Sequence, residues 1–226
     1  MTADQILSWS PSAIVFDCDG TLMDTERHWQ EARNITFRIF GLNPPPGFAD
    51  RAKGVHYTEC GALMAQETGK PDLVDDLAGT LLNTFTALVD QDPVTMPGAA
   101  ALVRLAARHR PLAVASNCPR SMVESCLARA GLLSCFQHVV VPGDDVRPKP
   151  EPDVYRAAAR LCGVPPHEAL AVEDSLTGME SARRAGLRVI GIGTRPPGPD
   201  AELADLWVAS LADSELLTWA RSRLGE

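Results

Sequence analysis

A regular alternation of short apolar runs with stretches of helical periodicity extends from residue 98 to the C-terminal region. The expected strands are residues 112–115, 138–141, 169–172, 187–192 and 207–209. The expected helices are residues 98–109, 120–130, 152–161, 176–185 and 213–223. Alternation of this kind is typical of a parallel sheet with helices on both faces. An α/β fold is therefore predicted.

A further strand is expected at residues 13–16, where an apolar run stops abruptly at two acids, a glycine and a threonine. Three stretches between this strand and the alternating region have helical spacing instead: residues 25–40, 57–69 and 72–89. No convincing strand interrupts them. We therefore expect the sheet domain to consist of residues 1–24 and 93–226, with residues 25–92 inserted into it as a helical block.

The composition excludes several classes of protein. Of the 226 residues, 45% are hydrophobic and 22% charged, which are ordinary values for a globular chain. A net charge of −8 argues against nucleic-acid binding, which depends on cationic side chains. The N-terminus lacks signal-peptide features and no apolar run is long enough to span a membrane, so we expect a cytoplasmic protein without membrane contact, and a monomer. The six cysteines form no C-x-x-C pair, which favours free thiols over a zinc site.

Polar residues follow four of the expected strands, directly or in the loop just beyond. They are Asp17 and Asp19, Ser116 and Asn117, Lys149, and Glu173 and Asp174. Because parallel strands present their carboxyl ends at one edge of the sheet, these side chains should converge in one crevice. Four carboxylates in one place repel one another, so the cluster calls for a divalent cation with oxygen ligands, and Mg²⁺ fits best. The hydroxyl, amide and ammonium groups are then left to bind phosphate oxygens.

Each of these short motifs also has a purely structural interpretation. An acid pair after a strand can be a simple turn, Ser116-Asn117 can cap a helix, and Glu173-Asp174-Ser175 can be a polar loop. Lys149 can be a surface residue, although the chain has only three lysines and 18 arginines, so a lysine at this place is unusual. The joint order of the motifs and their strand context favour the catalytic interpretation.

The sequence resembles the haloacid dehalogenase superfamily of phosphohydrolases. The resemblance lies in four motifs that occur in the superfamily's order: residues 17–26 (DCDGTLMDTE), 115–117 (ASN), 147–152 (RPKPEP) and 172–175 (VEDS). It covers nearly the whole chain from about Ala13. The resemblance implies a Rossmann-like core with a helical cap inserted between the first and second motifs, which agrees with the block at residues 25–92.

Carried over to this chain, the resemblance implies that Asp17 attacks phosphorus and becomes a transient aspartyl-phosphate. Asp19 would protonate the leaving oxygen and later activate water. The metal would be held by Asp17, the backbone carbonyl of Asp19, and Asp174, with Glu173 as a second ligand or as a holder of bound water. The implied activity is that of a Mg²⁺-dependent phosphatase acting on a small organic phosphomonoester of the sugar, polyol or glycolate phosphate type.

Phosphate binding would fall to the remaining groups of the four motifs. Ser116, Asn117 and Lys149 would offset charge on the transferring phosphoryl group, and backbone N–H groups near Gly20 would assist. Superfamily relatives that cleave carbon–halogen or carbon–phosphorus bonds replace the second acid of the first motif, so Asp19 argues against those reactions.

The cap is expected to select the substrate. Arg51, Lys53, His56 and Tyr57 surround Gly54 in the loop before the second long cap helix and are candidates for contacts to the leaving group. The alternative is that they face solvent or begin the helix. Mutase-like relatives show Arg where Tyr57 stands, which argues against a hexose phosphate substrate.

Two other functions remain open. One is a sugar phosphomutase of the β-phosphoglucomutase type, whose members show a histidine four residues after the threonine that corresponds to Thr25. Here that position is Trp29, and His28 precedes it by one step, or about 100° around a helix. This difference favours hydrolysis. The other is a binding module that has lost its chemistry, which would bind phosphate ligands without releasing phosphate.

Overall fold

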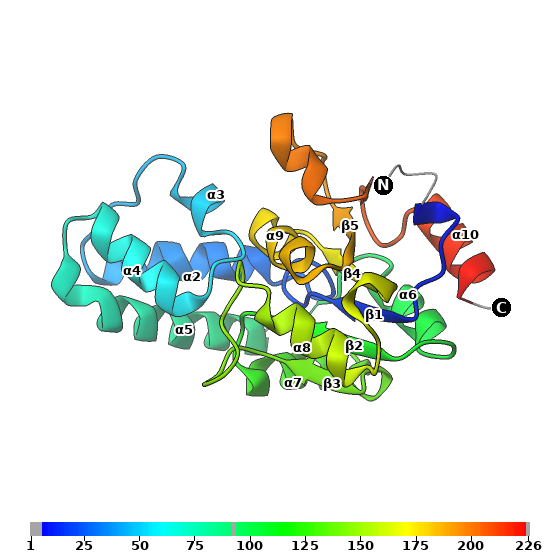
Figure 1. Ribbon diagram of the computed structural model, residues 1–226. Coiled ribbons are helices and arrows are strands. Elements are labelled where there is room, and N and C mark those ends of the chain that lie inside the picture. Colours follow the sequence, from blue (N-terminus) through cyan, green and yellow to red (C-terminus); the bar gives the residue numbers. More distant parts are fainter. Residues whose placement is uncertain (1–5, 92–93, 225–226) are drawn as a thin grey trace.

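The computed structural model describes residues 6–91 and 94–224 (Figure 1). Its six strands form one sheet in the order β3-β2-β1-β4-β5-β6, and every adjacent pair is parallel. The strands are β1 (Ala13–Phe16), β2 (Leu112–Ala115), β3 (His138–Val140), β4 (Ala169–Glu173), β5 (Arg188–Ile192) and β6 (Leu206–Val208). The predicted parallel sheet is therefore confirmed, with strand ends within one or two residues of the sequence prediction.

Strand β1 occupies the middle of the sheet and sets the position of the polar edge. Val15 pairs with Ala113 of β2 on one side and with Ala171 of β4 on the other. All three strands run in the same direction, so their carboxyl ends lie next to one another. The residues that follow these ends are consequently brought together at one edge of the sheet, as the sequence predicted.

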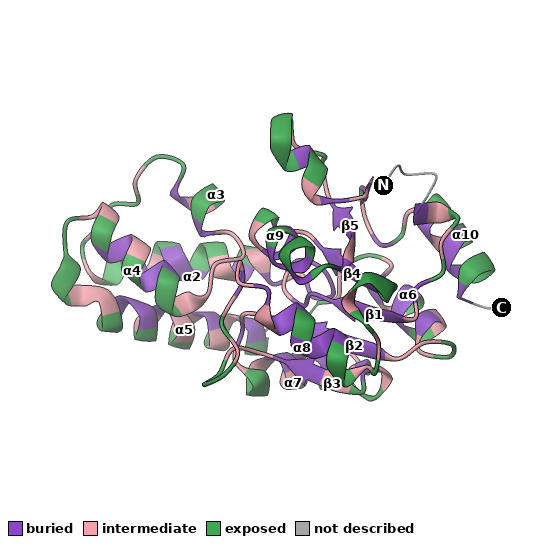
Figure 2. Ribbon diagram, viewed as in Figure 1, coloured by how far each residue is buried: buried purple, intermediate pink, exposed green. Residues whose placement is uncertain are grey.

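Both faces of the sheet are covered by helices, and the alternation of side chains along β1 shows how. Ile14 and Phe16 belong to the hydrophobic cluster on one face, whereas Val15 belongs to the cluster on the other. Helices α6 (Ala99–Ala106), α7 (Arg120–Arg129) and α10 (Ser214–Arg223) cover the first face, and α8 (Asp153–Leu161) and α9 (Leu176–Ala185) cover the second. The strands are buried on both sides, as Figure 2 shows.

The helical block lies to one side of the sheet (Figure 1). It contains α2 (Glu26–Ile39), α3 (Phe48–Ala52), α4 (Tyr57–Glu67) and α5 (Val74–Gln91). Helix α5 packs against both α2 and α4, and the rings of Trp29 and Phe85 stack at a centroid distance of 3.6 Å. Division of the chain at residues 24/25 and 92/93 stays a prediction, because the second boundary and residues 1–5 lie outside the described residues. Among the helices described, none is both long and apolar enough to cross a bilayer.

Candidate active site

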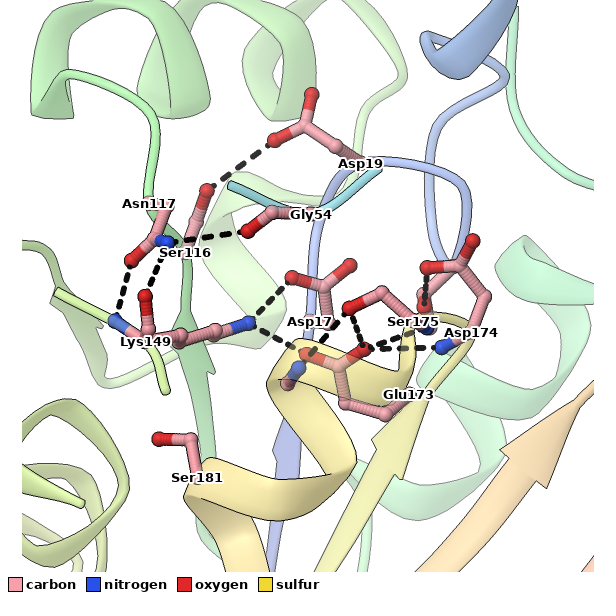
Figure 3. Close-up of polar contacts among 12 residues, drawn as sticks. Asp17, Asp19, Gly54, Ser116, Asn117, Lys149, Glu173, Asp174, Ser175 and Ser181 are labelled. Atoms are coloured by element: carbon pink, nitrogen blue, oxygen red, sulfur yellow. Dashed lines mark hydrogen bonds and ion pairs between the residues drawn. The ribbon is translucent and has the colours of Figure 1, made fainter. Parts of the chain in front are cut away.

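The carboxyl edge of the sheet brings the polar core residues of the four motifs into one cluster (Figure 3). Asp17 follows β1 directly, Ser116 follows β2, and Glu173 is the last residue of β4. Lys149 reaches the same place from the loop after β3. Ser175 then accepts a hydrogen bond from the N–H of Gly178 and caps α9, which fixes the turn that carries Glu173 and Asp174.

Lys149 bridges two of the carboxylates. Its Nζ lies 2.6 Å from Asp17 Oδ1 and 2.6 Å from Glu173 Oε1, and the side chain is 2% exposed. Burial alone would lower the pKa of Lys149, but the Asp17 and Glu173 carboxylates raise it well above its ordinary value. The amide of Asn117 holds the backbone on both sides of the same residue, through the N–H (2.9 Å) and the carbonyl (3.2 Å) of Lys149. Lys149 is thus a fixed ammonium ion beside Asp17.

Glu173 is fully buried and both of its oxygens are engaged. Oε1 accepts from Lys149 Nζ and from the hydroxyl of Tyr155 at 3.0 Å. Oε2 accepts from the backbone N–H groups of Asp174 and Ser175 and from the Ser175 hydroxyl, each at 3.0 Å. These contacts suit a residue that positions Lys149 better than a residue that offers a ligand atom. Sequence reasoning missed Tyr155, whose place on the apolar face of α8 resembles that of an ordinary core residue.

Gly178 makes room for the Glu173 carboxylate. A Cβ atom added at Gly178 would lie 1.7 Å from Glu173 Oε1 and 2.1 Å from Cδ, so the Gly178→Ala variant must displace a carboxylate held by five hydrogen bonds. We expect this variant to lose at least about 2 kcal/mol of unfolding free energy in urea titrations, because a buried polar network is broken. The control is Gly79→Ala on the exposed side of α5, where nothing lies within 4 Å of the added atom. It should gain up to about 1 kcal/mol. Equal stabilities of the two variants would contradict this role of Gly178.

The carboxylates fit a bound metal ion. Oxygens of Asp17, Glu173 and Asp174 lie within 4.8 Å of one another. Asp17 Oδ2 is buried and has no hydrogen-bond partner among the described residues. Burial and the neighbouring Glu173 raise the pKa of Asp17 well above its ordinary value, and burial raises that of Asp174 to about 6. A donor set made only of oxygens, with excess negative charge, is typical of sites for hard divalent cations.

Gly20 has a structural role in the loop after β1. Its backbone N–H donates to the carbonyl of Met23 at 2.7 Å and is not directed at a phosphate in this conformation, while phosphate binding by N–H groups near Gly20 stays a prediction. Its φ of 85° and lack of a side chain let the loop pass Asp174 closely, since a Cβ there would lie 2.5 Å from Asp174 Oδ2. The next residue, Thr21, donates from its hydroxyl to Asp174 Oδ1 at 3.3 Å.

Asp19 lies apart from the Lys149 bridge and connects two other elements. Its Oδ1 accepts from the hydroxyl of Thr25 at 2.7 Å. Its Oδ2 accepts from the hydroxyl of Ser116 at 3.2 Å, the contact that Figure 3 shows. Thr25 is the residue before helix α2, so the second acid of the pair contacts the beginning of the helical block. The Ser116 oxygen also accepts from the N–H of Cys118 at 3.0 Å, which fixes the orientation of this hydroxyl.

The loop between α3 and α4 closes over the carboxylates. Lys53 Nζ lies 2.8 Å from Asp174 Oδ2 and donates to the carbonyl of Asp174 at 3.1 Å. The carbonyl of Gly54 accepts from the Asn117 amide at 3.1 Å. The cavity between this loop and the carboxylates has a volume of about 30 Å³. In this conformation the loop between α3 and α4 therefore narrows the space next to Asp174.

The four cap residues selected from the sequence divide into two pairs. Lys53 and Tyr57 line the cavity. Arg51 instead forms a bidentate ion pair with Glu67 and lies outside the lining residues. His56 also lies outside them, with its Nδ1 2.7 Å from the hydroxyl of Thr58. In this conformation a local partner on the cap holds the side chains of Arg51 and His56 away from the cavity, and their contact with a leaving group stays a prediction.

Helix α2 contributes three residues to the cavity that sequence reasoning did not select as contacts: Glu26, Trp29 and Arg33. Their spacing of three and four residues was the available signal, because it places them on one face of a helix. Trp29 lines the cavity, whereas His28 is buried outside its lining residues. Of these two neighbouring residues, only Trp29 is therefore placed to contact a bound substrate.

Comparison with known proteins agrees with this geometry. A family model described as haloacid dehalogenase-like hydrolase matches residues 11–186. Protein CbbY of Cereibacter sphaeroides is 36% identical over 79% of this chain and 82% of its own length. The 6-phosphogluconate phosphatase of Escherichia coli strain K12 is 30% identical over 78% of this chain and 80% of its own. The crystal structure of β-phosphoglucomutase from Clostridium difficile covers 96% of this chain and 100% of its own with a TM-score of 0.80, and at 19% identity it shows the fold alone.

Proposed function

Because the chain belongs to the haloacid dehalogenase-like hydrolase family, we propose that Asp17 is the nucleophile of a phosphatase that acts on a small organic phosphomonoester. The observation that carries the proposal is the environment of Asp17. Lys149 holds Oδ1, while Oδ2 is buried and without a hydrogen-bond partner in the described part of the chain. One oxygen is thus fixed and the other is available for attack on phosphorus or for a cation.

The cation in this proposal is Mg²⁺. The carboxylates of Asp17 and Asp174 and the backbone carbonyl of Asp19 would hold it, and it would supply positive charge opposite the transferring phosphoryl group. Glu173 acts in this scheme as a positioning residue, because its two oxygens already accept five hydrogen bonds. Lys149 adds a second positive charge at the nucleophile.

The two acids divide the remaining work. An oxygen of Asp17 attacks phosphorus, the bond from phosphorus to the leaving oxygen breaks, and Asp19 donates a proton to that oxygen. In the second half, Asp19 takes a proton from water, whose oxygen attacks the phosphorus of the aspartyl-phosphate and releases inorganic phosphate and Asp17. Asp19 fits this role because Thr25 and Ser116 hold it at the beginning of the helical block, apart from the Lys149 bridge. Opening and closing of the cap would move it between hydrogen-bond partners.

The substrate is proposed to be a sugar or polyol phosphate. The cavity is lined by charged and hydrogen-bonding groups from both the core and the helical block, which suits a leaving group that carries hydroxyls. The 30% identical relative named 6-phosphogluconate phosphatase supports the same class. Water is the favoured acceptor, since Trp29 lines the cavity where mutase-like relatives show histidine.

Removal of the metal tests the proposal. Inorganic phosphate release from sugar and polyol phosphates, phosphoglycolate and nucleotides should require Mg²⁺ and should fall to background in EDTA. Activity should return on addition of excess Mg²⁺. Phosphate release that persists in EDTA would overturn the metal-dependent mechanism. Interconversion of hexose phosphate isomers without net phosphate release would overturn hydrolysis and establish a mutase instead.

We also propose that the protein acts in the cytoplasm as a monomer. The six cysteines are free thiols, which suits a reducing compartment. Size-exclusion chromatography with light scattering measures the oligomeric state directly, and a stable dimer at low micromolar concentration would contradict the second part of this proposal.

A further inference from the structure

The cap side of the cavity carries an ion pair between a buried arginine and a glutamate whose side chain is 29% exposed. Arg33 is 4% exposed, and its Nη2 lies 2.6 Å from Oε1 of Glu26 on the same helix. Its Nη1 donates to the carbonyl of Ala52 at 3.4 Å, in the residue before Lys53. Arg33, Glu26 and Lys53 all line the cavity and face the catalytic carboxylates. The guanidinium is therefore held in one orientation at the wall of the site.

The burial of Arg33 is not explained by stability alone. Removing its charge from water costs several kcal/mol, and a well-packed apolar residue often stabilises such a position as well or better. Burial of Glu26 raises the pKa of its carboxyl group despite the neighbouring Arg33, which shows that the environment disfavours the charge. Such a pair at the wall of an active site indicates a role in recognition.

The charges on the cap side favour an anionic leaving group. Among the cap residues that line the cavity in the described part of the chain, two are cations, Arg33 and Lys53, and one is an anion, Glu26. Lys53 pairs with Asp174 in this conformation. A cation held by Asp174 would take over that carboxylate, and Lys53, whose side chain is 41% exposed, would then be free to turn to the substrate. The cap side would present a net positive charge.

We propose that Arg33 and Lys53 form a subsite for a second negatively charged group, a carboxylate or a phosphate, at the far end of the substrate's leaving group. Glu26 is a positioning residue that orients the Arg33 guanidinium, and Lys53 supplies the second cation. This inference rests on the proposed phosphatase function and deepens it by naming the substrate class. The preferred substrates are polyol phosphomonoesters that carry a distal anion.

A structural role of Arg33 makes a different prediction. Through Ala52, Arg33 also supports the loop that carries Lys53 and Gly54. If this support were its only role, loss of the side chain would impair every substrate to a similar extent. If Arg33 contacts a distal anion, loss of the side chain impairs substrates that carry one more than the matched neutral substrates.

Matched substrates separate these possibilities. In the first pair, sorbitol 6-phosphate carries a neutral CH₂OH group at the end far from the phosphate, where 6-phosphogluconate carries a carboxylate. In the second pair, mannitol 1-phosphate carries a hydroxyl at that end, where mannitol 1,6-bisphosphate carries a phosphate. The wild-type protein should prefer at least one anionic member by about tenfold or more in kcat/KM, since a charge-assisted hydrogen bond is worth roughly 1.5–3 kcal/mol. The pair that shows the preference identifies the anion.

Variants then assign the preference to residues. Arg33→Met and Lys53→Met should each lower kcat/KM for the anionic member by about tenfold or more beyond any loss for the neutral member of the same pair. Arg33→Lys should recover part of the loss. Arg51→Met is the matched control, because Arg51 is an arginine on the same block that lies outside the cavity lining, and it should leave both members unchanged. Thermal unfolding of each variant checks that it is folded.

Binding supplies a readout that is independent of turnover. In the Asp17→Asn background with Mg²⁺ present, calorimetry should give a Kd for the preferred anionic substrate that rises by about tenfold on addition of Arg33→Met. Equal losses of kcat/KM on neutral and anionic substrates, or no preference in the wild-type protein, would overturn the subsite. The phosphatase function would still hold in that case if the protein hydrolysed p-nitrophenyl phosphate in a Mg²⁺-dependent reaction. No phosphate release from any substrate would overturn the phosphatase function itself.

Discussion

Asp17→Asn is expected to abolish phosphate release, by at least about 10³-fold in kcat, because the variant lacks the carboxylate that attacks phosphorus. The amide keeps nearly the same shape, and Lys149 retains its second carboxylate partner, Glu173, at 2.6 Å. Steady-state assays with Mg²⁺ measure the loss. Mass spectrometry of acid-quenched reactions should detect a phosphorylated form of the wild-type protein at Asp17 and none of the variant.

The same substitution should not destabilise the fold. Burial and Glu173 raise the pKa of Asp17, so folding disfavours the charge of this side chain relative to the unfolded chain. An amide removes that charge, and the melting temperature without metal should stay the same or rise. Asp24→Asn is the control, because Asp24 is an exposed acid of the same motif paired with Arg27, and it should keep nearly full activity. Substantial turnover by Asp17→Asn, or loss of turnover through unfolding, would contradict the assignment.

The core of the site could be predicted from the sequence because two strong constraints act on it. An apolar strand that is buried on both faces has a recognisable pattern, and the residue after it is placed at the sheet edge by register alone. Asp17, Ser116 and Glu173 follow this rule, since β1 pairs with both β2 and β4. The convergence of these three residues can therefore be predicted without knowing the conformation of any loop.

The cap side could not be predicted in the same way, because loops and side-chain partners decide it. Arg51 and Lys53 are two residues apart, yet one pairs with Glu67 on the cap and the other reaches Asp174, 121 residues away in the chain. Helix α3 was not predicted, because its five residues follow a proline-rich loop and are too few to show a periodicity. Arg33 was missed because an arginine in the middle of an amphipathic helix is usually exposed.

Lys149→Met is expected to cost about 3–5 kcal/mol of unfolding free energy, because it leaves two buried carboxylates without their shared counter-ion. In the wild-type protein the ammonium lies 2.6 Å from an oxygen of Asp17 and 2.6 Å from an oxygen of Glu173, and all three side chains are less than a tenth exposed. Methionine replaces the four-atom apolar stem of the lysine and lacks the ammonium group, so the variant loses the charge and its hydrogen bonds. Phosphatase activity should fall with the loss of positive charge at the nucleophile. Urea titration at neutral pH and steady-state assays of the folded fraction measure the two effects.

A double variant separates the charge effect from a packing effect. In Asp17→Asn/Lys149→Met one of the two stranded carboxylates is removed, so the double variant should be more stable than Lys149→Met alone, by about 1 kcal/mol or more. Lys70→Met is the matched control, because Lys70 is exposed and its replacement should change stability by less than about 0.5 kcal/mol. If Lys149→Met unfolded at the same urea concentration as Lys70→Met, the predicted role of the Lys149 ammonium in stabilising the two buried carboxylates would be contradicted. Lys149 is thus predicted to contribute to both stability and catalysis through one atom. Its Nζ pairs with the buried Glu173 and with Asp17, the proposed nucleophile.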